Sequence, residues 1–218
     1  MGLRLFVALE LPAATRQRLA ERVRRARGDA PPARWVRREA MHVTLAFLGS
    51  VDGEWLPRIE RALTPAFAGH RRVDASVGGD LGTFPPRGKA RVLWADVRTR
   101  DATHGADTSK PLTSLQRSVA DALAALEAMD GTRLYTPEPR PYRPHVTLGR
   151  CRTPWARGVV TRFTTAAAGP PLPMPVHRGV LMQSHLEPRG ARYEIVSTYP
   201  LASPSGDAGL RRVEGGDR

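Results

Sequence analysis

The sequence contains a single cysteine, Cys151, among its 218 residues. One cysteine excludes a disulfide within the chain and is compatible with a reducing compartment. A nucleophilic thiol needs a base held beside it, and no residue pattern around Cys151 places one there. We therefore interpret Cys151 as a small packing side chain with no part in catalysis.

Long apolar runs are also lacking, and no stretch is long enough to span a bilayer. The apolar stretch at the N-terminus is short, is interrupted by Glu10 and lacks a small-residue cleavage site. It therefore predicts a first strand rather than a signal peptide. Together these features predict a cytoplasmic protein without a membrane segment.

Acidic residues are scarce compared with basic ones. The chain has 21 Asp and Glu against 34 Lys and Arg, a formal charge of +13, and nearly all the positive charge comes from arginine. Such an excess favours a polyanionic partner, usually nucleic acid. The abundance of Arg, Ala, Gly and Pro is equally typical of a GC-rich genome, so composition alone leaves both interpretations open.

Hydrophobic periodicity predicts an α+β fold with largely antiparallel sheets, because few strand–helix–strand crossovers occur. Helices are expected at 12–27, 53–68 and 111–129. Strands are expected at 4–11, 34–37, 41–48, 72–78, 90–98, 145–151, 175–186 and 192–201. The segment 99–110 is predicted to be a loop, and 202–218, which lacks periodicity, a disordered tail. The Walker and dinucleotide-binding patterns are both absent from the sequence.

One four-residue motif occurs twice, about half the chain apart. The two copies are His42-Val43-Thr44-Leu45 and His145-Val146-Thr147-Leu148, followed by Gly49 and Gly149. The spacing predicts a duplication, with halves at roughly 1–98 and 99–201. We expect one bilobal domain over 1–201, with two sheets related by a pseudo-two-fold axis and an active cleft between the lobes.

Strand periodicity places the histidine and the threonine of each copy on one face, above buried apolar neighbours. If the copies meet across a cleft, two imidazoles and two hydroxyls converge. That set suits in-line displacement at a phosphate diester, because one imidazole can act as base and the other as acid near neutral pH. Threonine hydroxyls can stabilise the non-bridging oxygens.

A zinc site is the main rival interpretation of the two histidines, His42 and His145. Zinc requires a third and a fourth ligand, and neither copy has a carboxylate or cysteine three or four residues further on. We therefore expect neither a metal nor another cofactor.

The paired motifs resemble those of the two-histidine (2H) phosphoesterase superfamily. Within it, the chain is most similar to the RNA 2′,3′-cyclic phosphodiesterases, historically called 2′-5′ RNA ligases. The resemblance covers nearly all of 3–201. It is carried by RLFVALELP, RWVRREAMHVTLAFLG, GTFPPRGKARVLWADV, YRPHVTLGR and SHLEPRGARYEIVSTYPL.

This resemblance implies metal-independent hydrolysis of RNA 2′,3′-cyclic phosphate ends to 2′-phosphates. By the family pattern, His42 is the proton donor to the departing 3′ oxygen and His145 is the proton acceptor that activates water. Thr44 and Thr147 would hold the phosphate. Gly149 stands where the family often has alanine, which affects no role. The implied partner is RNA with a cyclic phosphate end, and no obligate protein partner is evident.

Other residues have open alternatives. Arg143, two residues before His145, is predicted to bind phosphate, or else to be a solvated arginine. Phe84 and Tyr142 could stack on a terminal base or serve packing. Three basic residues could guide the RNA backbone or form a solvated strand edge, namely Arg34, Arg37 and Arg38. Four histidines match no motif and receive no role, namely His70, His104, His177 and His185.

Two other functions remain compatible with the sequence. The first is a non-catalytic RNA-binding module, which would not need two matched histidines. The second is another 2H activity, either on a different cyclic nucleotide or in the reverse direction, ligating RNA ends.

Overall fold

The computed structural model describes residues 2–28, 30–100, 107–128, 131–187 and 190–203. The helices are α1 (Ala13–Ala26), α2 (Leu56–Ala68), α3 (Lys110–Ala124) and α4 (Arg157–Ala167), with 3-10 turns η1 (Arg38–Ala40) and η2 (Gly53–Trp55). The strands are β1 (Leu3–Glu10), β2 (Ala33–Trp35), β3 (His42–Val51), β4 (Val73–Phe84), β5 (Ala90–Arg100), β6 (Asp107–Thr108), β7 (His145–Trp155), β8 (Leu172–Val176), β9 (Arg178–Glu187) and β10 (Gly190–Pro200). The predictions for Met129, His104 and the tail from residue 204 lie outside the described residues.

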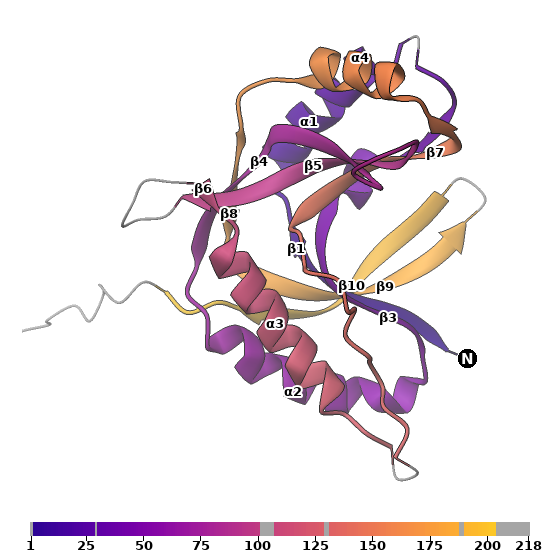
Figure 1. Cartoon of the computed structure of the whole chain (residues 1–218). Coiled ribbons are helices and arrows are strands. Elements are labelled where there is room, and N and C mark those ends of the chain that lie inside the picture. Colours follow the sequence, from indigo (N-terminus) through magenta and orange to yellow (C-terminus); the bar gives the residue numbers. More distant parts are fainter. Residues whose placement is uncertain (1, 29, 101–106, 129–130, 188–189, 204–218) are drawn as a thin grey trace, which may run out of the picture.

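The strands form one curled antiparallel sheet rather than the two sheets that the sequence predicts (Figure 1). Its order is β10-β9-β1-β3-β7-β5-β4-β8, with β2 beside β7 and β6 beside β5. The sheet has two portions, β10-β9-β1-β3 and β7-β5-β4-β8. They are joined because the motif strands β3 and β7 pair directly, at Val43 and Val146. Within the described ranges this is the one register pair between the two strands, so they separate on either side of it.

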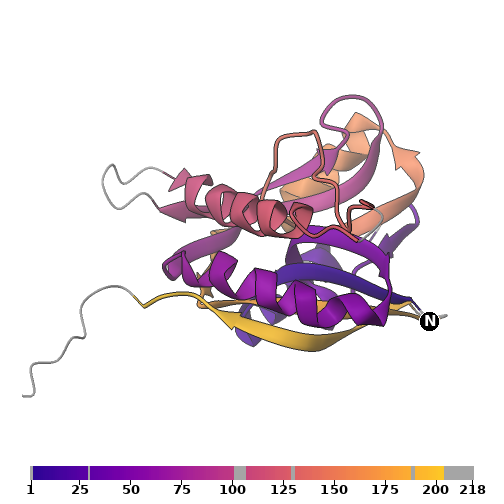
Figure 2. The same ribbon diagram turned by 90° about the horizontal axis from the view of Figure 1, so that it is seen from below.

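Helices cover the sheet in two pairs. α2 and α3 lie side by side against β3 and β10, and α1 and α4 lie together against β4 and β8 (Figures 1 and 2). The predicted apolar stripe of α2 is fully buried at Ile59, Leu63 and Phe67. Burying each such side chain contributes about 1.5–3 kcal/mol. No helix among the described residues is both long and apolar enough to cross a membrane.

The strand order mixes the two halves of the sequence. β4 and β5 lie with β7 and β8, whereas β9 and β10 return to lie beside β1. The two portions of the sheet therefore do not coincide with 1–98 and 99–201, and the duplication stays a prediction.

Two helices differ from the prediction. α3 ends at Ala124 rather than at 129, because the chain turns back there and the Ala128 amide donates to the Thr132 carbonyl. α4 is not predicted at all. Only Phe163 and Ala167 of this helix are buried, so its apolar stripe is too sparse to detect.

The strand expected at 72–78 extends further in the structure, as β4, to Phe84. An irregularity between Val77 and Leu81 accommodates Gly78, which has a φ of 76°. The Asp80 amide there donates to Asp96 Oδ1 over 2.7 Å, which holds the irregular segment against β5.

Candidate active site

The pairing of β3 with β7 brings the two motifs side by side. Val43 lies opposite Val146, and both are fully buried. The two histidines and two threonines are the immediate neighbours of this pair along β3 and β7. These four side chains alternate with the buried valines and therefore share the other face of the strands.

His42 is held by hydrogen bonds and by ring contacts. Its Nδ1 lies 2.9 Å from the Ala40 carbonyl oxygen, which can only accept, so Nδ1 carries the proton. Nε2 of the neutral ring is then the basic nitrogen, and it lies 3.1 Å from Thr44 Oγ1. The rings of Phe6 and Tyr193 pack against the imidazole at centroid distances of 4.8 and 5.2 Å.

His145 has the same tautomer. Its Nδ1 donates to the Arg143 carbonyl over 2.7 Å, which leaves Nε2 as the basic nitrogen. Phe84 packs edge-on against the ring at 5.1 Å, and Trp94 lies at 6.2 Å. Both imidazoles are therefore oriented by a backbone carbonyl two residues earlier, with Nε2 available for proton transfer.

A cavity of about 310 Å³ lies beside these groups. Its lining includes His42, Thr44 and Thr147, together with the cationic side chains of Arg4 and Arg150. The lining also includes aromatic side chains from β1, β3 and β10, namely Phe6, Phe47 and Tyr193. Phe47 is 53% exposed, so its ring is accessible to a ligand. The cavity combines the His42 imidazole, hydrogen-bond donors, positive charge and an aromatic surface, whereas His145 is not among its lining residues.

The model of the 2′-5′ RNA ligase superfamily matches residues 12–187. The chain belongs to this superfamily. An RNA 2′,3′-cyclic phosphodiesterase of Archaeoglobus fulgidus is 28% identical over 199 residues, covering 90% of this chain and 99% of the relative. A Geobacillus stearothermophilus protein of the same name is 27% identical over 209 residues, which are 94% of this chain but 59% of the relative.

Solved structures of relatives share the superfamily fold. The protein TT0787 of Thermus thermophilus matches with a TM-score of 0.69 and 26% identity, over 91% of this chain and 97% of its own. Escherichia coli LigT complexed with 3′-AMP matches with a TM-score of 0.60 and 23% identity, over 92% and 99%. The α+β fold with a curled antiparallel sheet is therefore shared with these proteins.

Burial is the main cause of the shifted pKa values of the two site imidazoles, His42 and His145. The pKa of His42 is lowered to about 4 by burial, against the opposing effect of the Ala40 carbonyl and with a smaller lowering by the nearby His145. Burial also lowers the pKa of His145, with smaller contributions from the charges of Arg143 and Arg150. Both rings are therefore neutral in the free protein at pH 7. An anionic phosphate placed between them would favour protonation.

Arg150 is a site residue that the sequence reasoning missed. Simple alternation from His145 and Thr147 places position 150 on the opposite face. The ladder with β5 is irregular, however: Leu93 and Trp94 are adjacent, whereas their partners Gly149 and Thr147 are two residues apart. This irregularity turns Arg150 into the cavity. The arginine that closes the sequence HVTLGR was the available signal.

Arg143 does not line this cavity. Its side chain is exposed, and Cζ lies 4.4 Å from the centroid of the Trp94 ring. It contributes instead to a second cavity of about 240 Å³, whose lining includes Asp96 and Thr108. Its phosphate contact stays a prediction, and the geometry favours Arg150 for that role.

The predicted stacking residues have different positions. The Tyr142 hydroxyl donates to the Thr44 carbonyl over 3.0 Å, and the ring packs against the core. Burial raises the pKa of Tyr142. Tyr142 thus ties the segment before β7 to β3, which favours the packing alternative, and stacking of its ring on a base stays a prediction. Phe84 packs on His145 and Trp94.

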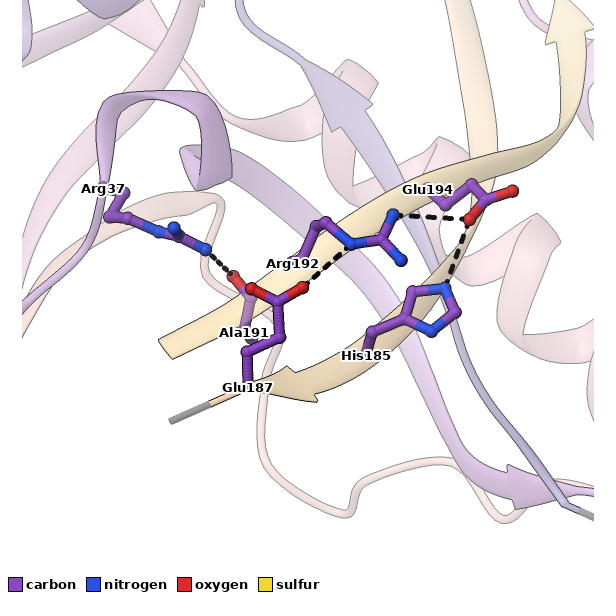
Figure 3. A network of polar contacts seen from close by, with 6 residues as sticks. All are labelled: Arg37, His185, Glu187, Ala191, Arg192 and Glu194. Atoms are coloured by element: carbon purple, nitrogen blue, oxygen red, sulfur yellow. Dashed lines mark hydrogen bonds and ion pairs between the residues drawn. The ribbon is translucent and has the colours of Figure 1, made fainter. Parts of the chain in front are cut away.

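The β9–β10 hairpin forms one side of the cavity, through Ser184, Ala191 and Tyr193. Figure 3 shows how it is held: the Arg37 guanidinium donates to the Ala191 carbonyl over 2.9 Å. Along the hairpin, Arg192 forms ion pairs with the carboxylates of Glu187 and Glu194. His185 Nε2 lies 3.3 Å from Glu194 Oε2. Arg37 therefore supports the wall of the cavity.

The other residues with open roles lie outside the cavity. Arg38 pairs with its neighbour Glu39 at 2.9 Å, and Arg34 lies on β2 opposite Arg150. His70 contacts the Ser118 hydroxyl at 2.8 Å, and His177 is exposed. Across the described residues, no group of three or more His, Cys, Asp or Glu side chains could hold a metal ion.

Proposed function

We propose that this protein opens 2′,3′-cyclic phosphates at RNA ends by hydrolysis to 2′-phosphates. One observation carries the proposal: two imidazoles with basic Nε2 atoms and two threonine hydroxyls share one face where β3 pairs with β7. Relatives named RNA 2′,3′-cyclic phosphodiesterase support the same chemistry.

In the proposed reaction the cyclic phosphate lies between the two rings. His145 Nε2 accepts a proton from water as the water oxygen attacks phosphorus. The bond from phosphorus to the 3′ oxygen breaks, and His42 gives a proton to that oxygen, so the phosphate remains on the 2′ oxygen. Each proton transfer is worth on the order of 10²–10⁴ in rate. His42 must be protonated by then, which the bound anion favours.

The phosphate would be held by three side chains that line the cavity with His42. Thr44 and Thr147 can donate hydrogen bonds to the non-bridging oxygens. The Arg150 guanidinium supplies positive charge and planar donors that match a phosphate. Imidazole, hydroxyl and guanidinium groups suffice for this scheme, which we therefore propose to be independent of metal.

The terminal nucleoside would occupy the part of the cavity beyond His42. The leaving 3′ oxygen and the base belong to one ribose, so the base must lie on the side of the acid. There the lining includes the exposed ring of Phe47, with Arg4 Cζ at 5.7 Å from its centroid, and Tyr193. Aromatic rings and guanidinium planes are the usual stacking partners of unpaired bases.

We also propose that the curled sheet is two lobes related by a pseudo-two-fold axis. The order β10-β9-β1-β3 in one portion is matched by β8-β4-β5-β7 in the other. Each portion has four strands in this path, ends on a motif strand and carries one pair of helices. The cleft would then lie between the lobes.

The test is incubation of the chelator-treated protein with an oligoribonucleotide that bears a 2′,3′-cyclic phosphate. We expect the 2′-phosphate as product, and His42→Ala or His145→Ala to reduce the rate on the order of 10²–10⁴-fold. His177→Ala is the matched control, because His177 is exposed. Activity restored only by zinc or manganese, or a 3′-phosphate product, would contradict the proposal. Binding without turnover would favour a non-catalytic RNA-binding module.

A further inference from the structure

The two catalytic histidines lie in matched sequence motifs, but their imidazoles make different numbers of hydrogen bonds. His42 Nε2 has Thr44 Oγ1 at 3.1 Å, whereas no hydrogen bond joins His145 to Thr147 in the described structure. His145 therefore depends on a single hydrogen bond, from Nδ1 to the Arg143 carbonyl, and on its ring contacts. Whatever fixes the backbone of Arg143 also fixes the ring of His145.

The side chain of Arg143 has a specific partner, although it is exposed. Its guanidinium lies over the indole of Trp94, with Cζ 4.4 Å from the centroid. Tryptophan is the best aromatic partner for a cation, and the planar guanidinium can stack on it. The segment before β7 belongs to no helix or strand at 141–144. The stack adds to the contacts of the two neighbouring residues, because the Tyr142 hydroxyl donates to the Thr44 carbonyl and the Pro144 carbonyl accepts from the Val97 amide.

Trp94 is in turn seated against β4 and the site. It is 4% exposed and lies opposite Gly82, where an added Cβ would come within 2.2 Å of its ring. It also lies opposite Thr147 and contacts the rings of Phe84 and His145. Only glycine at position 82 leaves room for the indole in this place. The indole is thus a fixed platform beside the catalytic ring.

We infer that the stack of Arg143 on Trp94 is a positioning device for His145. It holds the carbonyl that keeps the proton on Nδ1 and so leaves Nε2 basic. Arg143 is then a positioning residue that acts through its main chain, and it need not touch the substrate. The effect on catalysis rests on the proposed function, whereas the effect on the tautomer does not.

The test compares Arg143→Ala with Arg58→Ala. Arg58 is a matched control, because its Cζ also lies 4.4 Å from a tryptophan centroid, that of Trp55, on α2 and η2 away from the site. We expect Arg143→Ala to lower kcat roughly tenfold or more with KM within about twofold, since misplacing a catalytic group by about 1 Å costs on the order of a hundredfold. Arg143→Lys, which keeps the charge but not the plane, should fall between alanine and wild type.

Nitrogen NMR of the imidazole rings provides a readout without substrate. In Arg143→Ala, His145 should populate both tautomers, while Arg58→Ala should match the wild type. Trp94→Leu should give the same mixture, and adding Arg143→Ala to it should change little further, because coupled residues are not additive.

Three results would overturn the inference. The first is a His145 tautomer and a kcat that are unchanged in Arg143→Ala. The second is a raised KM with unchanged kcat, which would make Arg143 a substrate-binding residue. The third is an additive effect of the two substitutions. A wild-type protein without phosphodiesterase activity would contradict the proposed function alone, since the tautomer measurement would still decide the role of Arg143.

Discussion

Burial of His42 should make the stability of the fold depend on pH. The folded ring has a pKa of about 4, because burial disfavours its charged form. In the unfolded chain the pKa returns to about 6.5. Between these values the unfolded state binds more protons than the folded state, so stability falls as the pH decreases from about 6.5 to about 4. The shift corresponds to at most ~3 kcal/mol, at about 1.4 kcal/mol per pH unit.

His42→Asn removes this titration while its amide can still donate to the Ala40 carbonyl. Urea denaturation of both proteins at pH 7 and pH 4.5 measures the free energies of unfolding. We expect the wild type to lose roughly 2–3 kcal/mol more than the variant on acidification. The high positive charge destabilises both proteins in acid, so the difference between them isolates His42. Equal losses of unfolding free energy in the two proteins would contradict a lowered pKa of His42 in the folded state.

Three further predictions concern catalysis. Arg150→Ala should reduce kcat/KM roughly 10- to 100-fold, since hydrogen bonds to charged groups contribute about 1.5–3 kcal/mol. Arg150→Lys should recover part of the lost kcat/KM. An unchanged kcat/KM in Arg150→Ala would show that Arg150 does not bind the phosphate. Phe47→Ala should raise KM several-fold if the base stacks there, as base–aromatic stacking contributes about 1–3 kcal/mol, whereas Ile195→Ala, also exposed, should not. The profile of kcat/KM against pH should be bell-shaped with its maximum below about 6.5, because the pKa values of both imidazoles are lowered; a maximum above about pH 7 would contradict this.

The shared face of the histidine and the threonine within each motif could be predicted because strand alternation is local. A histidine and a threonine two residues apart must share a face, whatever the partner strand. The same reasoning failed for Arg150, because the irregular ladder between β5 and β7 reverses the alternation after Thr147. For Tyr142 it left packing and stacking open, because the hydrogen bond of its hydroxyl to the Thr44 carbonyl joins segments 98 residues apart.

The fold shows the same division between local and long-range information. The helices α1 and α2 were predictable from their buried stripes, such as Leu19 and Val23 in α1. The single sheet was not, because it depends on direct pairing of Val43 with Val146, and no local pattern indicates which strands pair. The position of β9 and β10 beside β1 is likewise a long-range contact that periodicity does not determine.

In the proposed reaction, His42 protonates the leaving 3′ oxygen while His145 activates water. An analogue in which sulfur replaces the bridging 3′ oxygen tests it most directly, because a thiolate leaves without prior protonation: a free thiol has a pKa of about 8.5. With this analogue, the rate of His42→Ala should come within about tenfold of the wild-type rate. The rate of His145→Ala should stay on the order of 10²–10⁴-fold below the wild-type rate. Restoration of His145→Ala instead would reverse the two roles, and restoration of neither variant would contradict acid–base catalysis by this pair.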